Sequence, residues 1–168
     1  MKIFIVIPCY NEEAVLPKTL EVLGNLIKNI KVKTDADTEL LLVDDGSRDR
    51  TWQMISNAAK EHRYVHGIKL SHNRGHQNAL WAGMEAAVDH CDAMVSIDAD
   101  LQDDENVIID MVQQVQEGKD ITPMMGAFPF CRDHRHIHRQ VNPCVTFKSG
   151  LIAQNCGRHW NRLHSAYR

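Results

Sequence analysis

Short apolar runs alternate with helical patterns over the first 118 residues of this chain, and this alternation restricts the fold more than any other feature. The runs are rich in Ile, Leu and Val and lie at residues 3–7, 39–43, 67–70 and 93–97. An apolar run without polar alternation is typical of a strand buried on both faces, as in parallel sheets. We therefore predict an α/β fold in which right-handed crossovers join mainly parallel strands and helices cover both faces.

The segments between these runs carry the apolar spacing of amphipathic helices. In the first segment, apolar residues recur every three or four positions, at Leu16, Leu20, Leu23, Ile27 and Ile30. Further helices are predicted at about residues 51–61 and 78–91, and from 107 to near 118. Asp49 is the expected N-cap of the second helix, and the helical spacing assigns Trp52 and Trp81 to the core.

The composition is that of an ordinary globular protein, with 43% hydrophobic and 24% charged residues. No apolar run approaches the roughly 20 residues that a membrane span needs, and the opening segment is too short for a signal peptide. Five cysteines without a CxxC pair fit a reducing compartment better than a disulfide framework. We therefore expect a cytoplasmic location.

Polar residues follow each of the four apolar runs. In parallel α/β sheets, ligands bind outside the carboxyl ends of the strands, so these residues are the candidate site. They are Pro8, Tyr10, Asn11 and Glu12 after the first run, Asp44 and Asp45 after the second, Arg74 after the third, and Asp98, Asp100 and Gln102 after the fourth.

The sequence Asp98-Ala99-Asp100 is the most specific of these features. Two carboxylates one residue apart at a sheet edge are costly unless positive charge lies between them. Mg²⁺ or Mn²⁺ supplies that charge, because such ions bind one or two carboxylates together with water and substrate phosphates. Gln102 would add a neutral oxygen. The alternative is an acidic helix start, to which we assign the next acids, Asp103, Asp104 and Glu105.

The other strand ends each allow a ligand-binding and a structural interpretation. The carboxylates of Asp44 and Asp45 could accept hydrogen bonds from a base or ribose, or one of them could form an Asx turn with Gly46 at positive φ. Tyr10 could stack on a base and Glu12 could accept a ribose hydroxyl, or this segment could cap a helix.

The segment after the third run contains Arg74, which could pair with phosphate at a helix N-terminus or be a solvated charge. His72 and His76 lie four residues apart, but Asn73 and Gly75 indicate a loop rather than a zinc-binding helix. We therefore do not expect metal ligation there.

Four segments together, VIPCYNEE, LLVDDGSRDRTW, LSHNRGHQNALWAGM and SIDADLQDD, resemble the family 2 glycosyltransferases. The similarity is greatest to the branch with dolichyl-phosphate mannose synthase and the bacterial polyprenyl-phosphate glucosyltransferases. It covers residues 1 to about 121 and implies the Rossmann-like GT-A fold, with residues 1–121 as the donor-binding domain.

The resemblance implies a UDP- or GDP-sugar donor and a divalent metal. By this resemblance, Pro8, Tyr10 and Glu12 would line the nucleotide pocket, and Asp44 and Asp45 would contact the base and ribose. Asp98 would contact the ribose or the metal, and Asp100 with Gln102 would hold the metal on the diphosphate. Asp98 and Asp100 are thus the expected catalytic residues.

The expected reaction is transfer of a hexose with inversion, preferably to a polyprenyl phosphate at the cytoplasmic face of the membrane. An ionised phosphate needs no catalytic base, and none is evident after Asp100. Three alternatives remain: transfer to a saccharide hydroxyl, nucleotide-sugar binding without turnover, and a phospho-acceptor signalling domain, against which the Asp98–Asp100 spacing argues. No nucleic-acid partner is expected.

The last part of the chain has a different composition. Residues 1–120 carry 21 acids and 12 bases, net −9, whereas residues 121–168 carry one acid, Asp133, and seven bases, net +6. Our hypothesis is that a frameshift or truncated gene model produced residues 122–168. The alternatives are a basic patch that meets phosphates and a zinc site drawn from Cys131, His134, His136, His138, Cys144, Cys156 and His159.

Overall fold

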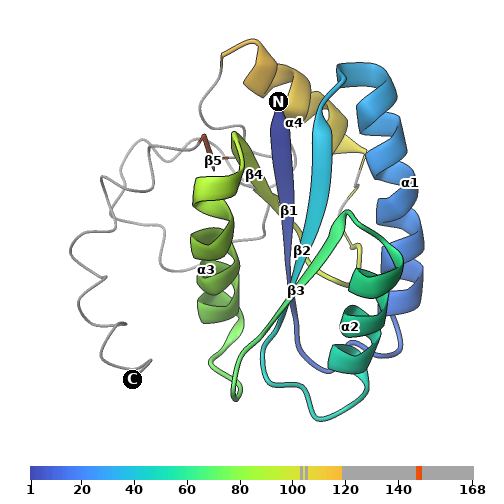
Figure 1. Cartoon of the computed structure of the whole chain (residues 1–168), viewed down its shortest axis with the longest axis vertical. Coiled ribbons are helices and arrows are strands. Elements are labelled where there is room, and N and C mark those ends of the chain that lie inside the picture. Colours follow the sequence, from blue (N-terminus) through green and yellow to red (C-terminus); the bar gives the residue numbers. More distant parts are fainter. Residues whose placement is uncertain (103, 105, 119–146, 149–168) are drawn as a thin grey trace, which may run out of the picture.

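The computed structural model describes residues 1–102, 104, 106–118 and 147–148. Its sheet has the order β3-β2-β1-β4-β5 (Figure 1). The strands are β1 (Lys2–Cys9), β2 (Asp37–Asp44), β3 (Val65–Lys69), β4 (Ala93–Ser96) and β5 (Phe147–Lys148). The helices are α1 (Leu16–Thr34), α2 (Thr51–Glu61), α3 (His76–Ala87), the 3-10 turn η1 (Val88–His90) and α4 (Val107–Gln116). The first four strands pair in parallel, as predicted, and β5 is antiparallel to β4.

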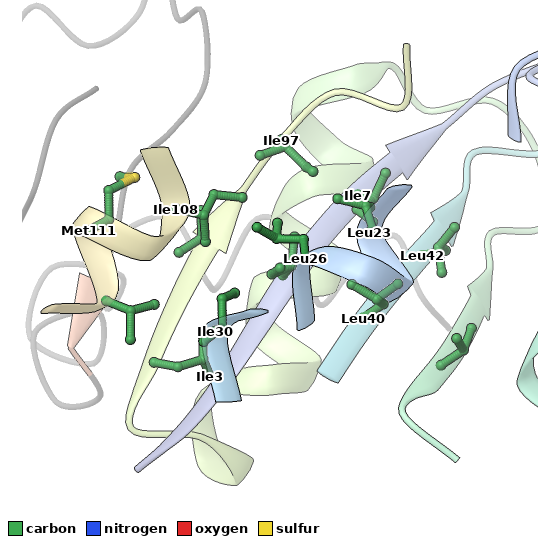
Figure 2. Packing of buried hydrophobic residues seen from close by; sticks show 14 of the residues in the cluster. Ile3, Ile7, Leu23, Leu26, Ile30, Leu40, Leu42, Ile97, Ile108 and Met111 are labelled. Carbon is green, nitrogen blue, oxygen red and sulfur yellow. The ribbon is translucent and has the colours of Figure 1, made fainter. Parts of the chain in front are cut away.

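Helices cover both faces of the sheet, as the apolar runs predicted. Figure 1 shows α3 on one side and α1 with α2 on the other. Alternate residues of β1 point to opposite faces, so Ile3, Ile5 and Ile7 join one core cluster while Phe4 and Val6 join the other. In Figure 2 the first cluster is formed by side chains of α1 and α4 packed over β1 and β2. Burial on both faces explains why the run has no polar alternation.

The strand order places a topological switch point beside β1. From β1 the chain moves outward through β2 to β3 and then returns to place β4 on the other side of β1. The register pairs Cys9 with Asp44 and Asp44 with Lys69, so the ends of three strands are level. A crevice outside the strand ends forms at such a point, between the loops after β1 and β4.

Some local predictions were wrong in detail. Helix α3 begins at His76, directly after Gly75 with φ of +90°, and not at residue 78. Trp81 is 45% exposed and lies outside the core, because the buried residues of α3 form a stripe that it does not join. Arg50 rather than Asp49 is the N-cap of α2, although the Asp49 carboxylate accepts the N–H of Thr51 at 2.9 Å.

Several expectations lie outside the described residues. They are the domain boundary at residue 121, the candidate zinc ligands of the tail (residues 122–168), and the assignment of Asp103 and Glu105 to a helix start. Within the tail the structure describes only Phe147–Lys148, a short strand that the sequence pattern did not predict. No helix in the described part of the chain is long and apolar enough to cross a membrane.

Gly83 allows α3 to lie close to the sheet, so we expect Gly83→Ala to destabilise the fold. A Cβ at this position would lie 2.5 Å from Val6 Cγ1 and 2.8 Å from Val43 Cγ2. Ala usually favours a helix over Gly by about 1 kcal/mol. Overpacking against two stiff valines outweighs this gain, and we expect the free energy of unfolding to fall by about 1–3 kcal/mol.

Urea denaturation would measure this change. The variant Val6→Ala makes room on the sheet, so the double variant should lose less stability than the sum of the two single changes. A Gly83→Ala protein more stable than the parent would contradict the close packing of α3.

Candidate functional site

A small cleft of about 160 Å³ lies at the carboxyl end of β1, next to the start of α3. Its lining residues are Pro8, Cys9, Tyr10, Glu12, Asp45, Asn73, His76 and Ala79. Of the ten residues predicted from the sequence, Pro8, Tyr10, Glu12 and Asp45 lie in this lining. Tyr10 is 40% exposed, which leaves one side of its ring open to a ligand.

The loop after β1 is held by the loop after β2. Asn11 has φ of +56°, donates its backbone N–H to Ser47 Oγ at 3.0 Å, and accepts the N–H of Arg48 on its side-chain oxygen at 2.9 Å. The N–H of Glu12 is donated to Thr51 Oγ1 at 2.8 Å. Asn11 therefore joins two loops and does not line the cleft, whereas Glu12 is held with its side chain at the cleft.

Asp45 holds the loop that leads into α3. It is 2% exposed, and its two carboxylate oxygens accept the N–H groups of Arg74 at 2.7 Å and of Gly75 at 2.8 Å. Arg74 itself is exposed and enters this contact only through its backbone. The structure thus gives Asp45 a positioning role that the sequence pattern did not indicate.

Asp44 forms the turn that was the structural alternative in the sequence. Its Oδ1 accepts the N–H of Ser47 at 3.1 Å, and Gly46 has φ of +69°. A Cβ on Gly46 would lie 2.5 Å from the carbonyl carbon of His72, so this loop packs directly on the backbone that precedes α3. Asp44 is fully buried, and its Oδ2 accepts no hydrogen bond from the described residues.

The Asp98-Ala99-Asp100 segment is anchored from α1. Thr19 donates its hydroxyl to the carbonyl oxygen of Ala99 at 2.6 Å, and Ala99 is 3% exposed. Asp98 is half-buried and Asp100 is exposed, and Asp100 Oδ1 accepts the N–H of Gln102 at 3.3 Å. Thr19 was not predicted from the sequence, although a threonine three residues after Leu16, within the apolar stripe of a helix, indicated a buried hydroxyl.

Carboxylates from three loops influence one another at this edge. Burial raises the pKa of Glu12, and the charges of Asp100, Asp49 and Asp98 raise it further. Folding therefore disfavours the ionised form of Glu12, so the fold loses stability as pH rises through the pKa of this carboxyl. A bound cation would offset this loss. Burial likewise raises the pKa of Cys9, with the charges of Glu12 and Asp44 adding to it, which disfavours the reactive thiolate form of this residue.

No three His, Cys, Asp or Glu side chains among the described residues come together closely enough to hold a metal ion by themselves. This is compatible with ions such as Mg²⁺, which commonly use one or two protein carboxylates and take their other ligands from water and substrate phosphates. The charges of Asp100, Asp49 and Asp98 add to the effect of burial on the pKa of Glu12, so several carboxylates act on one another here. The residues present therefore fit a cation that arrives with a phosphate ligand.

Two further acids, Asp104 and Asp49, form hydrogen bonds that hold the loops at this edge. Asp104 accepts the backbone and side-chain N–H groups of Asn106 on Oδ1, at 3.0 and 3.1 Å, and its carbonyl accepts the N–H of Val107. Asp104 thus supports the start of α4, as the sequence predicted. Asp49 joins the second loop to the first, since its Oδ2 accepts the N–H of Glu13 at 3.1 Å.

The family model described as "Glycosyl transferase family 2" matches residues 4–161. The chain belongs to glycosyltransferase family 2. One family relative is the uncharacterized glycosyltransferase YkoT of Bacillus subtilis, 45% identical over 121 residues, which make up 70% of this chain and 35% of YkoT. Another is the undecaprenyl-phosphate 4-deoxy-4-formamido-L-arabinose transferase of Proteus mirabilis, 40% identical over 121 residues, 71% of this chain and 35% of the relative. The chain spans about a third of the length of these family 2 relatives.

Two solved structures have the same architecture. TarS 1-349 of S. aureus superposes with a TM-score of 0.64 at 17% identity, over 92% of this chain and 49% of that structure. The mannosyltransferase PcManGT of Pyrobaculum calidifontis superposes with a TM-score of 0.52 at 20% identity, over 71% of this chain and 33% of that structure. These matches confirm the predicted GT-A fold.

The hydroxyl of Thr19 holds the acidic segment, so we expect Thr19→Val to weaken both the fold and the site. Valine has the same shape but leaves the buried carbonyl of Ala99 without its donor, which costs about 1–3 kcal/mol. Thermal or urea denaturation would measure the loss, and Thr19→Ser, which keeps the hydroxyl, is the matched control. A Thr19→Val protein as stable as the parent, with a loss only in Thr19→Ser, would show that the methyl group and not the hydroxyl matters.

Proposed function

We propose that this chain forms the donor-binding part of an inverting glycosyltransferase that transfers a hexose from a UDP- or GDP-sugar to a polyprenyl phosphate. The observation that carries the proposal is the group of carboxylates that the fold gathers at the switch point, where burial and then the charges of Asp100, Asp49 and Asp98 raise the pKa of Glu12. Membership of family 2 supports the reaction class.

The acidic side of the cleft would hold Mg²⁺ or Mn²⁺. Asp98 and Asp100 would provide the carboxylates and Gln102 a neutral oxygen, with the diphosphate of the donor completing the shell. When bound, the cation stabilises the negative charge that develops on the departing nucleoside diphosphate. PcManGT, which shares this fold, was solved with GDP-Man and Mn2+.

The other side of the cleft would bind the nucleoside. Pro8 and Ala79 are apolar lining residues, and the exposed ring of Tyr10 could stack on a base. Asp45 also lines the cleft, and each of its oxygens retains a lone pair beside the one used by the α3 loop. The TarS structure with UDP, of the same fold, is compatible with such a ligand.

Asn11, Asp44 and Arg74 belong to the proposed site in different ways. Asn11 and Asp44 would act through loop geometry, because each accepts a backbone N–H from the loop after β2. The side chain of Arg74 is exposed beside the start of α3 and could pair with a phosphate of the donor.

A polyprenyl phosphate acceptor fits this chemistry because its ionised oxygen attacks the sugar without a catalytic base. Relatives named undecaprenyl-phosphate formamido-arabinose transferases, from Proteus mirabilis and Shewanella sediminis, support this acceptor class. Such an acceptor would place the protein at the cytoplasmic face of the membrane during the reaction. Binding of a nucleotide-sugar without transfer is the second candidate.

Two measurements test the proposal. Calorimetric titration of UDP, GDP and their sugars, with and without Mn²⁺, should show cation-dependent binding of one nucleotide. A radiolabelled donor mixed with undecaprenyl phosphate in detergent should then give labelled lipid. Binding without transfer would favour the second candidate, and no cation-dependent binding would refute both.

A further inference from the structure

His76 is placed at the cleft by two elements that lie far apart in the sequence. It is the first residue of α3 and lines the cleft, with its side chain 46% exposed. Its Nε2 lies 3.6 Å from Asp98 Oδ1, at the end of β4. The imidazole is therefore next to the acidic segment and also open to a ligand.

Charge makes His76 distinctive among the cleft residues. Among the described residues, eight line the cleft, and His76 is the only one of these with a basic side chain. A diphosphate that enters this cleft approaches the carboxylates of Glu12 and Asp98, which repel it. A bound cation offsets part of this repulsion, and an imidazole N–H, present in either protonation state, could donate a hydrogen bond to a phosphate oxygen.

The position of His76 is fixed by the backbone that precedes it. Asp45 accepts the N–H groups of Arg74 and Gly75 in the two preceding residues, and Gly46 packs against the backbone of His72. The side-chain amide of Asn78 donates to the carbonyl of Arg74 at 2.6 Å, which ties this loop to the first turn of α3. A residue held in this way loses little conformational freedom when it binds a ligand.

We propose that His76 is a donor-binding residue, which donates an imidazole N–H to the diphosphate of the nucleotide-sugar beside the cation on Asp98. This rests on the proposed function and adds to it a phosphate contact from the start of α3. The contact recognises the diphosphate and not the base, so it should act equally on UDP and GDP.

The test compares ligands with and without the diphosphate. UDP and GDP with Mn²⁺ would be titrated by calorimetry, and uridine and guanosine by NMR, against the full chain and the variants His76→Ala, His76→Gln and His72→Ala. His72 is the matched control, because it is exposed, lies four residues away and pairs with Ser71 Oγ at 2.9 Å outside the cleft lining.

We expect His76→Ala to weaken binding of the preferred nucleoside diphosphate about tenfold, the effect of losing one charge-assisted hydrogen bond. Nucleoside binding should change less than twofold, His76→Gln should retain part of the affinity through its amide N–H, and His72→Ala should match the parent. If the His76→Ala protein melts at a lower temperature than the parent, the diphosphate affinities of His76→Gln and the parent are compared instead.

Two results would overturn the inference alone: unchanged diphosphate affinity in His76→Ala, or an equal loss for the nucleoside, which would mean that His76 only shapes the cleft. A parent chain that binds neither UDP nor GDP with Mn²⁺ would instead overturn the proposed function, and this inference with it.

Discussion

Asp100→Asn is expected to remove most of the cation-dependent binding of UDP or GDP. The asparagine oxygen can still accept the N–H of Gln102, as Asp100 Oδ1 does at 3.3 Å, so the loop should keep its conformation while the charge is lost. Affinity should fall by roughly 100-fold, since even changes to the hydrogen-bond partners of metal ligands cost 10- to 100-fold. Calorimetric titration of the nucleotide at fixed Mn²⁺ would measure the change.

A second readout of the same variant does not depend on any ligand. Asp100 is the first of the charges that raise the pKa of Glu12, so its neutralisation should lower that pKa toward the ordinary value for a glutamate. A carboxyl-detected NMR titration would follow Glu12 directly. A Glu12 pKa that does not move would show that the charge of Asp100 does not act on Glu12.

Asp104→Asn is the control for this prediction. Asp104 lies four residues further along the chain, and its carboxylate accepts hydrogen bonds only from Asn106 among the described residues. An asparagine oxygen can accept the same bonds, and nucleotide affinity should stay within twofold of the parent. Equal losses in Asp100→Asn and Asp104→Asn would refute the assignment of the cation site.

Asp45→Asn is expected to have the largest effect on stability. Its buried carboxylate accepts two backbone N–H groups, and the amide that replaces one oxygen would direct its own N–H toward a donor. Hydrogen bonds to charged groups contribute about 1.5–3 kcal/mol each, so we expect the free energy of unfolding to fall by about 3 kcal/mol. Urea denaturation at neutral pH would measure it.

The same variant should also impair nucleotide binding, because Asn73 and His76 line the cleft and their positions depend on the loop that Asp45 holds. Asp89→Asn is the matched control for the charge change, since Asp89 is exposed and the structure shows no hydrogen bond or ion pair for it within the described residues. Stability of Asp45→Asn equal to that of Asp89→Asn would mean that the loop is held by other contacts.

Much of the fold followed from local sequence pattern. Runs such as residues 3–7 predicted strands buried on both faces, and the spacing of Leu16, Leu23 and Ile30 predicted α1. Because parallel strands end at one edge, the sequence also predicted that Glu12 and Asp98 would lie near one another. In the structure burial raises the pKa of Glu12, and the charges of Asp100, Asp49 and Asp98 add to this effect. These inferences succeed because periodicity determines which side of an element a residue faces.

The partners of each polar side chain could not be predicted in this way. Asp45 was a candidate ligand contact, and in the structure both of its carboxylate oxygens accept N–H groups of a loop about 30 residues further along the chain. Thr19 was not considered, yet its hydroxyl reaches Ala99 across 80 residues of sequence. Trp81 was assigned to the core and lies at the surface.

The sequence by itself determined the elements, the parallel sheet, its buried faces and the edge at which the polar loops meet. The tertiary structure decided which of those polar residues support the loops and which face the cleft, and it placed His76 beside Asp98. The reason is that the spacing of apolar residues is local to each segment and sets which side of an element a residue faces. Each loop hydrogen bond instead depends on the order of strands and on close packing such as that of Gly46 on His72.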